Sequence, residues 1–177
     1  MKKLKENKIM GFKEIKFEEL DINLFEFWSK DWVLVTAGDK DKANTLTAGW
    51  GGFGVFWGKD TVSVYIRSER YTKEFMDDNE GFSITSFGSG NREQLAYLGK
   101  VSGRDGDKIQ AAGFTTKYDG EVPYIAEGNI VFICKKLVKA PLLPDTFLDK
   151  VNDEKFYPKK DYHTLYIAEI EKILMKI

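Results

Sequence analysis

Glycine clusters divide the apolar runs of this chain into short pieces, and this spacing restricts the folds that it can adopt. Glycines gather at 49–58, 81–90 and 99–113, and apolar stretches lie between these clusters. Turn residues at such intervals are typical of short strands joined by turns. The alternating strands and helices of a doubly wound sheet are not seen. The pattern therefore predicts a β-barrel or a β-sandwich.

Six segments are predicted strands. In the clearest one, Val62, Val64 and Ile66 alternate with more polar residues. A period of two places such apolar side chains on one face of a strand. The predicted strands are 32–36, 45–50, 61–67, 81–87, 129–136 and 163–173.

Two short helices are predicted, at 72–78 and 91–99. Asn91 is the expected N-cap of the second helix. Segment 141–162 contains three of the four prolines and is predicted to be mostly loop. Residues after Ile173 are predicted to be a frayed tail.

Size and composition indicate an ordinary globular chain. The chain has 177 residues, of which 42% are hydrophobic and 31% charged, so a single domain is expected. A net charge of −1 gives no reason to expect binding to nucleic acid or anionic lipid. No apolar stretch approaches the ~20 residues of a membrane span, and no signal peptide is recognised. A cytoplasmic location is expected, and the single cysteine, Cys134, agrees with a reducing compartment.

The first polar motif lies where a predicted strand gives way to a predicted helix. Guanidinium groups and hydroxyls are concentrated there, and free N–H groups at a helix start favour an anion. Arginine also fits phosphate oxygens bidentately. The motif could instead be a solvated turn in which Glu69 and Glu74 neutralise the arginines. Its candidate phosphate ligands are Arg67, Ser68, Arg70, Tyr71 and Thr72.

The second motif is the polar loop 102–108. Its glycines would let Arg104 and Lys108 reach a second anionic group, with Ser102 beside them. Residue types alone leave open a plain surface loop with internal Asp–Arg pairing, which would contribute little stability.

The third motif is a strand of small and polar residues that ends at Trp50. Amide, hydroxyl and backbone groups on such a strand can bind the polar edge of a flat heterocycle, and small residues let a ring approach. An ordinary strand ending in a glycine turn is the alternative. The glycines at 49–54 match neither a dinucleotide-binding loop nor a P-loop. The candidate residues are Asn44, Thr45, Leu46, Thr47, Ala48 and Trp50.

The remaining reactive side chains give weak signals by themselves. His163 is the one histidine, and a lone histidine is more often structural than catalytic. With one distant cysteine, a zinc site has no adequate ligand set, and no G-x-S-x-G segment positions a nucleophilic serine. Cys134 lies within an apolar strand pattern and is expected to be buried.

Taken in order, five segments resemble the flavin reductase-like family of FMN-binding split barrels, and most of all its flavoredoxin-like branch. The resemblance runs from about residue 30 to 173 and treats 1–25 as an N-terminal extension. A proline common before the third strand is replaced by Gly58-Lys59-Asp60, and Ser68 replaces another in the phosphate turn. The matching segments are 44–52, 64–72, 82–85, 98–108 and 163–170.

This resemblance implies a mainly β fold: a six-stranded antiparallel split barrel of Greek-key type with short helices, forming a homodimer with FMN near the interface. It implies that strand 44–50 faces the isoalloxazine ring. Arg67, Ser68, Arg70 and Thr72 would hold the phosphate. Ser102, Arg104 and Lys108 would close over the flavin or a nicotinamide. His163 would lie by the reacting face or the phosphate end.

The function implied is transfer of electrons from NAD(P)H through bound FMN to an acceptor. The flavin supplies the chemistry, so no catalytic side chain and no metal are predicted. Two alternatives remain. One is a flavoredoxin-like electron carrier that works with a redox protein, and the other is a binding module of the same fold without turnover.

Overall fold

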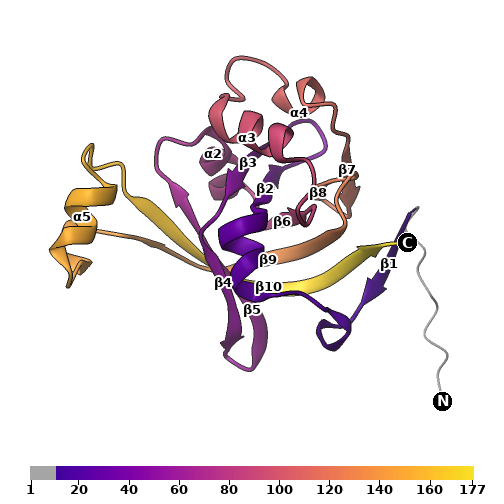
Figure 1. Cartoon of the computed structure of the whole chain (residues 1–177), viewed down its shortest axis with the longest axis horizontal. Coiled ribbons are helices and arrows are strands. Elements are labelled where there is room, and N and C mark those ends of the chain that lie inside the picture. Colours follow the sequence, from indigo (N-terminus) through magenta and orange to yellow (C-terminus); the bar gives the residue numbers. More distant parts are fainter. Residues whose placement is uncertain (1–10) are drawn as a thin grey trace.

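The computed structural model describes residues 11–177 as an antiparallel β structure with short helices (Figure 1). Single turns of 3-10 or π helix lie at Phe17–Glu19, Phe27–Asp31 and Pro144–Thr146. The α-helices are α1 Leu24–Glu26, α2 Tyr71–Asp78, α3 Arg92–Lys100, α4 Lys108–Ala111 and α5 Lys150–Phe156. The strands are β1 Phe12–Ile15, β2 Val33–Gly38, β3 Ala43–Ala48, β4 Gly51–Phe56, β5 Lys59–Arg67, β6 Gly81–Ser86, β7 Thr116–Asp119, β8 Val122–Ile125, β9 Ile130–Pro141 and β10 His163–Lys176.

The main sheet confirms the six predicted strands, which are β2, β3, β5, β6, β9 and β10. Its order is β3-β2-β6-β9-β10-β5-β4, with β1 also paired to β10, and every pairing is antiparallel. Strands β1 and β4 therefore enlarge the sheet to eight strands. Strands β7 and β8 form a separate hairpin.

Strand β4 lies in the glycine-rich stretch that the sequence indicated as a turn. Glycine has no side chain, so a strand rich in glycine lacks the alternation of apolar and polar residues that identifies a strand in the sequence. A Cβ atom at Gly51 would lie 2.5 Å from the indole ring of Trp28, so the close approach of that ring requires a glycine at this position.

The core follows the alternation seen in the sequence. Val62, Val64 and Ile66 of β5 are almost wholly buried. They pack in one cluster with Phe82 and Phe132 from β6 and β9. Burial of these side chains fixes the register of β5 and hence the position of its end, Arg67.

Helices α2 and α3 confirm the two predicted helices, with bounds shifted by a residue. Asn91 precedes α3 as predicted, but its side chain makes no capping hydrogen bond. The backbone of Asn91 is left-handed, with φ of 56°, whereas a capping side chain needs an extended backbone. The predicted capping interaction is therefore wrong.

Two predictions near the C-terminus are also wrong. Segment 141–162 is not mostly loop, because Pro144 opens a 3-10 turn and α5 follows, with Asp149 capping α5. We call residues 142–162 the α5 arm, and Figure 1 shows it projecting from the rest of the molecule at the ends of β9 and β10. Residues after Ile173 do not fray, because β10 continues to Lys176 between β1 and β9.

Cys134 is buried in β9, as predicted, and burial raises the pKa of its thiol. Within residues 11–177, no helix has the length and apolar character needed to cross a membrane.

Candidate functional site

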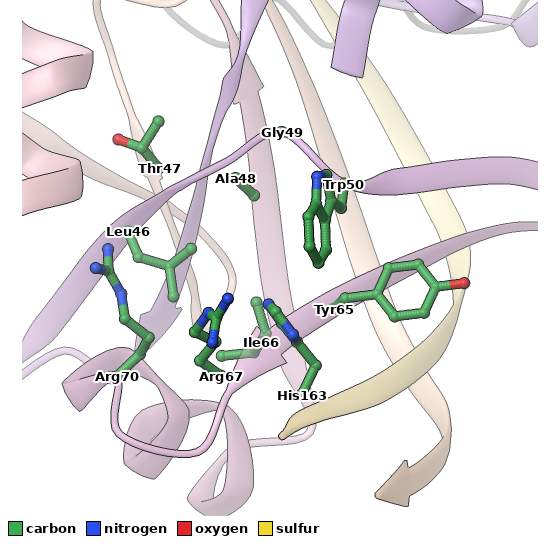
Figure 2. A pocket seen from close by; sticks show the side chains of 10 residues that line it. All are labelled: Leu46, Thr47, Ala48, Gly49, Trp50, Tyr65, Ile66, Arg67, Arg70 and His163. Atoms are coloured by element: carbon green, nitrogen blue, oxygen red, sulfur yellow. The ribbon is translucent and has the colours of Figure 1, made fainter. Parts of the chain in front are cut away.

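A polar cavity of about 230 Å³ lies between the end of β3 and the end of β5 (Figure 2). It brings together residues from two predicted motifs and the lone histidine. Gly49, from the predicted strand 44–50, also lines it, together with Tyr65 and Ile66, which had no predicted role as ligands. The lining residues are Leu46, Thr47, Ala48, Gly49, Trp50, Tyr65, Ile66, Arg67, Arg70 and His163.

The two arginines are positioned by a tight turn between β5 and α2. The backbone N–H of Arg70 donates to the carbonyl of Arg67 over 3.1 Å, and the N–H of Ser68 donates to the carbonyl of Tyr162 over 3.2 Å. Arg70 is the N-cap of α2, and its side chain makes no capping bond. The first N–H groups of α2 are therefore left without a side-chain acceptor from the N-cap, beside two cations.

Arg67 is fixed by the α5 arm. Its Nη1 lies 2.5 Å from a carboxylate oxygen of Asp161, and its Nη2 donates to the carbonyl of Phe156 over 3.1 Å. Burial acts to raise the pKa of Asp161, but the bond from Arg67, the backbone N–H of Asp161 and the charge of Arg67 together outweigh it, so the pKa is lowered. In the alternative of a solvated turn, Glu69 and Glu74 were the expected counterions, but in the folded chain Arg67 pairs with Asp161 instead.

Arg70 is held more loosely than Arg67. Its Nη1 donates to the carbonyl of Gly99 over 2.6 Å, which leaves most of the guanidinium N–H groups for another acceptor. Burial lowers its pKa, and nearby Arg67 adds to this effect. Two cations that repel each other across a partly buried space favour an anion between them. In the view of Figure 2, Arg67 lies between Arg70 and His163.

Trp50 and His163 form the aromatic part of the wall, and His163 is the cross-strand neighbour of Arg67. Their ring centroids are 5.1 Å apart, and the edge of Phe156 contacts the indole at 5.5 Å. Trp50 remains 44% exposed, whereas His163 is buried. Burial, aided by Arg67, lowers the pKa of His163 to about 4, so the imidazole is neutral at pH 7.

Strand β3 supplies the rim of the cavity, but its hydroxyls point elsewhere. The Thr47 hydroxyl donates to the carbonyl of Leu95 over 2.5 Å, and Figure 2 shows this side chain directed away from the arginines. The Thr45 hydroxyl is buried against that of Thr36 at 2.9 Å. Thr45 does not line the cavity, so what β3 offers there is its backbone and small side chains.

Residues of the 102–108 loop are placed elsewhere. Arg104 and Lys108 line a different cavity, of about 450 Å³, together with Asn44 and Tyr71. Arg104 is paired with Glu74 and lies 4.6 Å from the centroid of the Tyr71 ring.

The other predicted ligands in this region also have internal partners. The Lys108 ammonium is buried and donates to the carbonyls of Leu98 and Val101 at the end of α3. Ser102 accepts from the Arg104 backbone N–H. Thr72 is buried and accepts a bond from the Asn44 amide over 3.0 Å. Ser68 lies in the turn but does not line the polar cavity.

An apolar cavity of about 570 Å³ adjoins the polar one, and the two share Gly49, Trp50 and Tyr65. This combination of an apolar space with a few convergent polar groups is typical of small-molecule sites. Apart from Trp50, its aromatic residues were not among the predicted ligands, because their spacing follows no period. The other residues around it are Leu24, Phe25, Trp28, Ser29, Gly51, Gly52, Phe53, Leu142 and Tyr157.

Solved structures with the same fold were found. An FMN-binding domain of a flavin reductases-like enzyme from Shewanella baltica has a TM-score of 0.66 and 18% identity, covering 93% of this chain and 77% of its own. Flavoredoxin from Desulfovibrio vulgaris has a TM-score of 0.65 and 19% identity, with coverages of 92% and 77%. Flavoredoxin from Methanosarcina acetivorans has a TM-score of 0.63 and 23% identity, with coverages of 88% and 74%.

The comparison with curated proteins gave no match. The family model described as the flavin reductase like domain matches residues 29–176, which is most of the chain. The antiparallel topology, the matched range and the fold of the solved structures agree with one another. The chain belongs to the flavin reductase like domain family.

Proposed function

We propose that this chain binds FMN and acts as a flavin reductase-like oxidoreductase. The observation that carries the proposal is the convergence of Arg67, Arg70, Trp50 and His163 on one cavity that adjoins an apolar space. A phosphate ester joined to a flat aromatic ring system needs both kinds of surface. The proteins with the same fold include an FMN-binding domain and flavoredoxins, which supports this choice of ligand.

In this proposal, Arg70, Arg67 and the first N–H groups of α2 hold the phosphate. The backbone of β3 borders the ring system, and Trp50 covers one part of it and excludes water. FMN, when bound, would supply hydride and electron-transfer chemistry. The protein's contribution is binding, orientation and the electrostatic environment, in which neutral His163 adds no charge of its own.

The electron donor is proposed to be NAD(P)H, and the acceptor is a small molecule or a protein. A second candidate is an electron carrier that receives electrons from a redox protein. The observation that favours this second candidate is the presence of two flavoredoxins among the proteins with the same fold.

We also propose that residues 1–177 form one domain and that the chain works as a homodimer. Leu24, Phe25 and Trp50 are exposed at the edge of the apolar cavity. A second copy would remove this apolar surface from water. Light scattering during size-exclusion chromatography tests the dimer directly, and a mass equal to one chain would contradict it.

The function is tested by the visible spectrum of the purified protein, followed by anaerobic additions of NADH and NADPH. Flavin bands that bleach rapidly with one nucleotide would support the reductase and identify its donor. Bands that bleach only with dithionite would support the carrier. A colourless protein that does not bind added FMN would overturn the proposal.

A further inference from the structure

His163 has a hydrogen-bond partner in the α5 arm. The hydroxyl of Tyr157, at the C-cap of α5, lies 2.8 Å from Nδ1 of His163. The two rings meet edge to face, with centroids 5.5 Å apart. Both side chains are buried, with 4% and 7% of their surface exposed. A buried pair of this kind has a defined donor and a defined acceptor.

The direction of the hydrogen bond follows from the surroundings of Tyr157. Among residues 11–177, Nδ1 of His163 is the one hydrogen-bond partner of the Tyr157 hydroxyl. If Nδ1 carried the proton, the buried hydroxyl hydrogen would have no acceptor, which is unfavourable for a buried polar group. If the hydroxyl donates, both its hydrogen and the Nδ1 lone pair are satisfied.

Both groups keep their protonation states over the physiological range. Burial raises the pKa of Tyr157, and burial lowers the pKa of His163 to about 4. A neutral imidazole carries one N–H group, so a hydroxyl that occupies Nδ1 as donor leaves the proton on Nε2. Figure 2 shows the imidazole reaching into the polar cavity, between Arg67 and Trp50.

We propose that Tyr157 is a positioning residue that holds His163 in the Nε2–H tautomer, so that a neutral N–H donor faces the ligand of the polar cavity. The partner of this donor is an oxygen or nitrogen acceptor of the bound flavin, and this part rests on the proposed function. The α5 arm thereby acts on the site, because it carries Tyr157 together with Asp161, the partner of Arg67.

The chain's one histidine makes the tautomer directly measurable. Protein labelled with ¹⁵N-histidine would be studied without ligand at pH 7 by long-range ¹H–¹⁵N correlation. We expect an unprotonated, pyridine-like Nδ1 and a protonated, pyrrole-like Nε2. In Tyr157→Phe, we expect averaged nitrogen shifts because the preference for one tautomer is lost. An Nδ1–H tautomer in the wild type, or unchanged shifts in Tyr157→Phe, would overturn the proposal.

Tyr162→Phe is the matched control. Tyr162 packs on Tyr157 with ring centroids 5.0 Å apart, but its hydroxyl donates to Asp153 instead. Removal of that hydroxyl should leave both nitrogen shifts of His163 unchanged. If Tyr162→Phe averaged them as well, general loosening of the α5 arm would explain the effect and the specific role of Tyr157 would be rejected.

The contact with the ligand is tested by adding FMN to the same samples. We expect the Nε2–H proton signal to move, and Tyr157→Phe to bind FMN roughly two- to tenfold more weakly, as for one neutral hydrogen bond. An Nε2–H signal that does not move in FMN-saturated protein would overturn this contact. If FMN does not bind at all, the proposed function fails, while the ligand-free spectra still decide the tautomer.

Discussion

The junction 67–72 and the loop 102–108 carry similar residues, and the folded chain uses them differently. Each contains two cations and at least one hydroxyl. Arg67 and Arg70 line the cavity that also contains Trp50 and His163. Arg104 and Lys108 line a different cavity, and Lys108 is also held by the carbonyls of Leu98 and Val101 at the end of α3.

The two motifs differ in the partners that the fold brings to their cations. Lys108 is buried next to the end of a helix, where carbonyl groups lack internal partners, so its ammonium stabilises α3. Among residues 11–177, the Arg70 side chain donates to one carbonyl, that of Gly99. Arg70 therefore keeps most of its five N–H donors for a ligand, whereas Lys108 already uses two of its three, and the local sequence does not show this difference.

The largest expected effect comes from removing both junction arginines. Arg67→Ala with Arg70→Ala should weaken FMN binding at least about a hundredfold, because hydrogen bonds to a charged group contribute roughly 1.5–3 kcal/mol each. Fluorescence titration measures the dissociation constant, with riboflavin as the ligand that lacks phosphate. Riboflavin binding should change far less, and equal losses for both ligands would contradict the phosphate assignment.

His163 should make stability depend on pH. Its pKa of about 4 in the folded chain lies below the ordinary value of 6.5, so the unfolded chain binds the proton more readily. Stability is therefore complete above about pH 6.5 and falls as the pH drops toward 4, by up to about 3 kcal/mol. Asp161, Arg67 and Tyr157 face the same ring.

Urea unfolding of wild type and His163→Gln between pH 7 and 4 isolates this contribution. The titration of Asp161 is present in both proteins and largely cancels in their difference. The free energy of unfolding of the wild type should exceed that of the variant at pH 7, and this difference should shrink as the pH falls. A difference in unfolding free energy that stays constant would show that His163 is not the titrating group.

Strands in which apolar and polar residues alternate were predicted correctly from the sequence. Elements that contain several glycines or are flanked by prolines were missed. The alternation of Val62, Val64 and Ile66 identified β5. The glycines of β4 concealed a strand, and Pro144 with its neighbours made α5 look like loop. Pro144 stands at the start of its turn, where a missing N–H costs nothing.

In the candidate site, the proposed ligand-binding residues were predicted from the sequence, but their interaction partners were not. Arg67, Arg70, Trp50 and His163 were selected by residue type and do share a cavity. The pairing of Arg67 with Asp161 was not predicted, because the two residues are 94 positions apart in the chain. They come together because β5 and β10 pair in the sheet. Thr45 was selected as well, but it faces Thr36 across the sheet.

A smaller effect is expected from Asp161→Asn. This change keeps the shape of the side chain and removes the charge that competes for Arg67. FMN should bind roughly tenfold more tightly, as for one gained hydrogen bond to a charged group at the low end of its range, while riboflavin binding should not change. Weaker binding of both ligands would instead show that Asp161 serves the site mainly by holding the α5 arm.

The smallest effect is expected from Arg104→Ala, which tests the loop 102–108. Arg104 and Glu74 are both about half exposed, and exposed ion pairs contribute about 0–1 kcal/mol. Unfolding free energy should fall by less than about 1 kcal/mol, and FMN binding should change less than about twofold.

Glu74→Gln is the matched variant, because it releases Arg104 without removing it. If Arg104 remains a surface residue, FMN affinity stays the same in both variants. If loop 102–108 closes over the ligand, Arg104 must leave Glu74 to do so. Arg104→Ala would then weaken FMN binding and Glu74→Gln would strengthen it, because the competing carboxylate is gone. Opposite shifts in the two dissociation constants would therefore show that Arg104 contacts FMN.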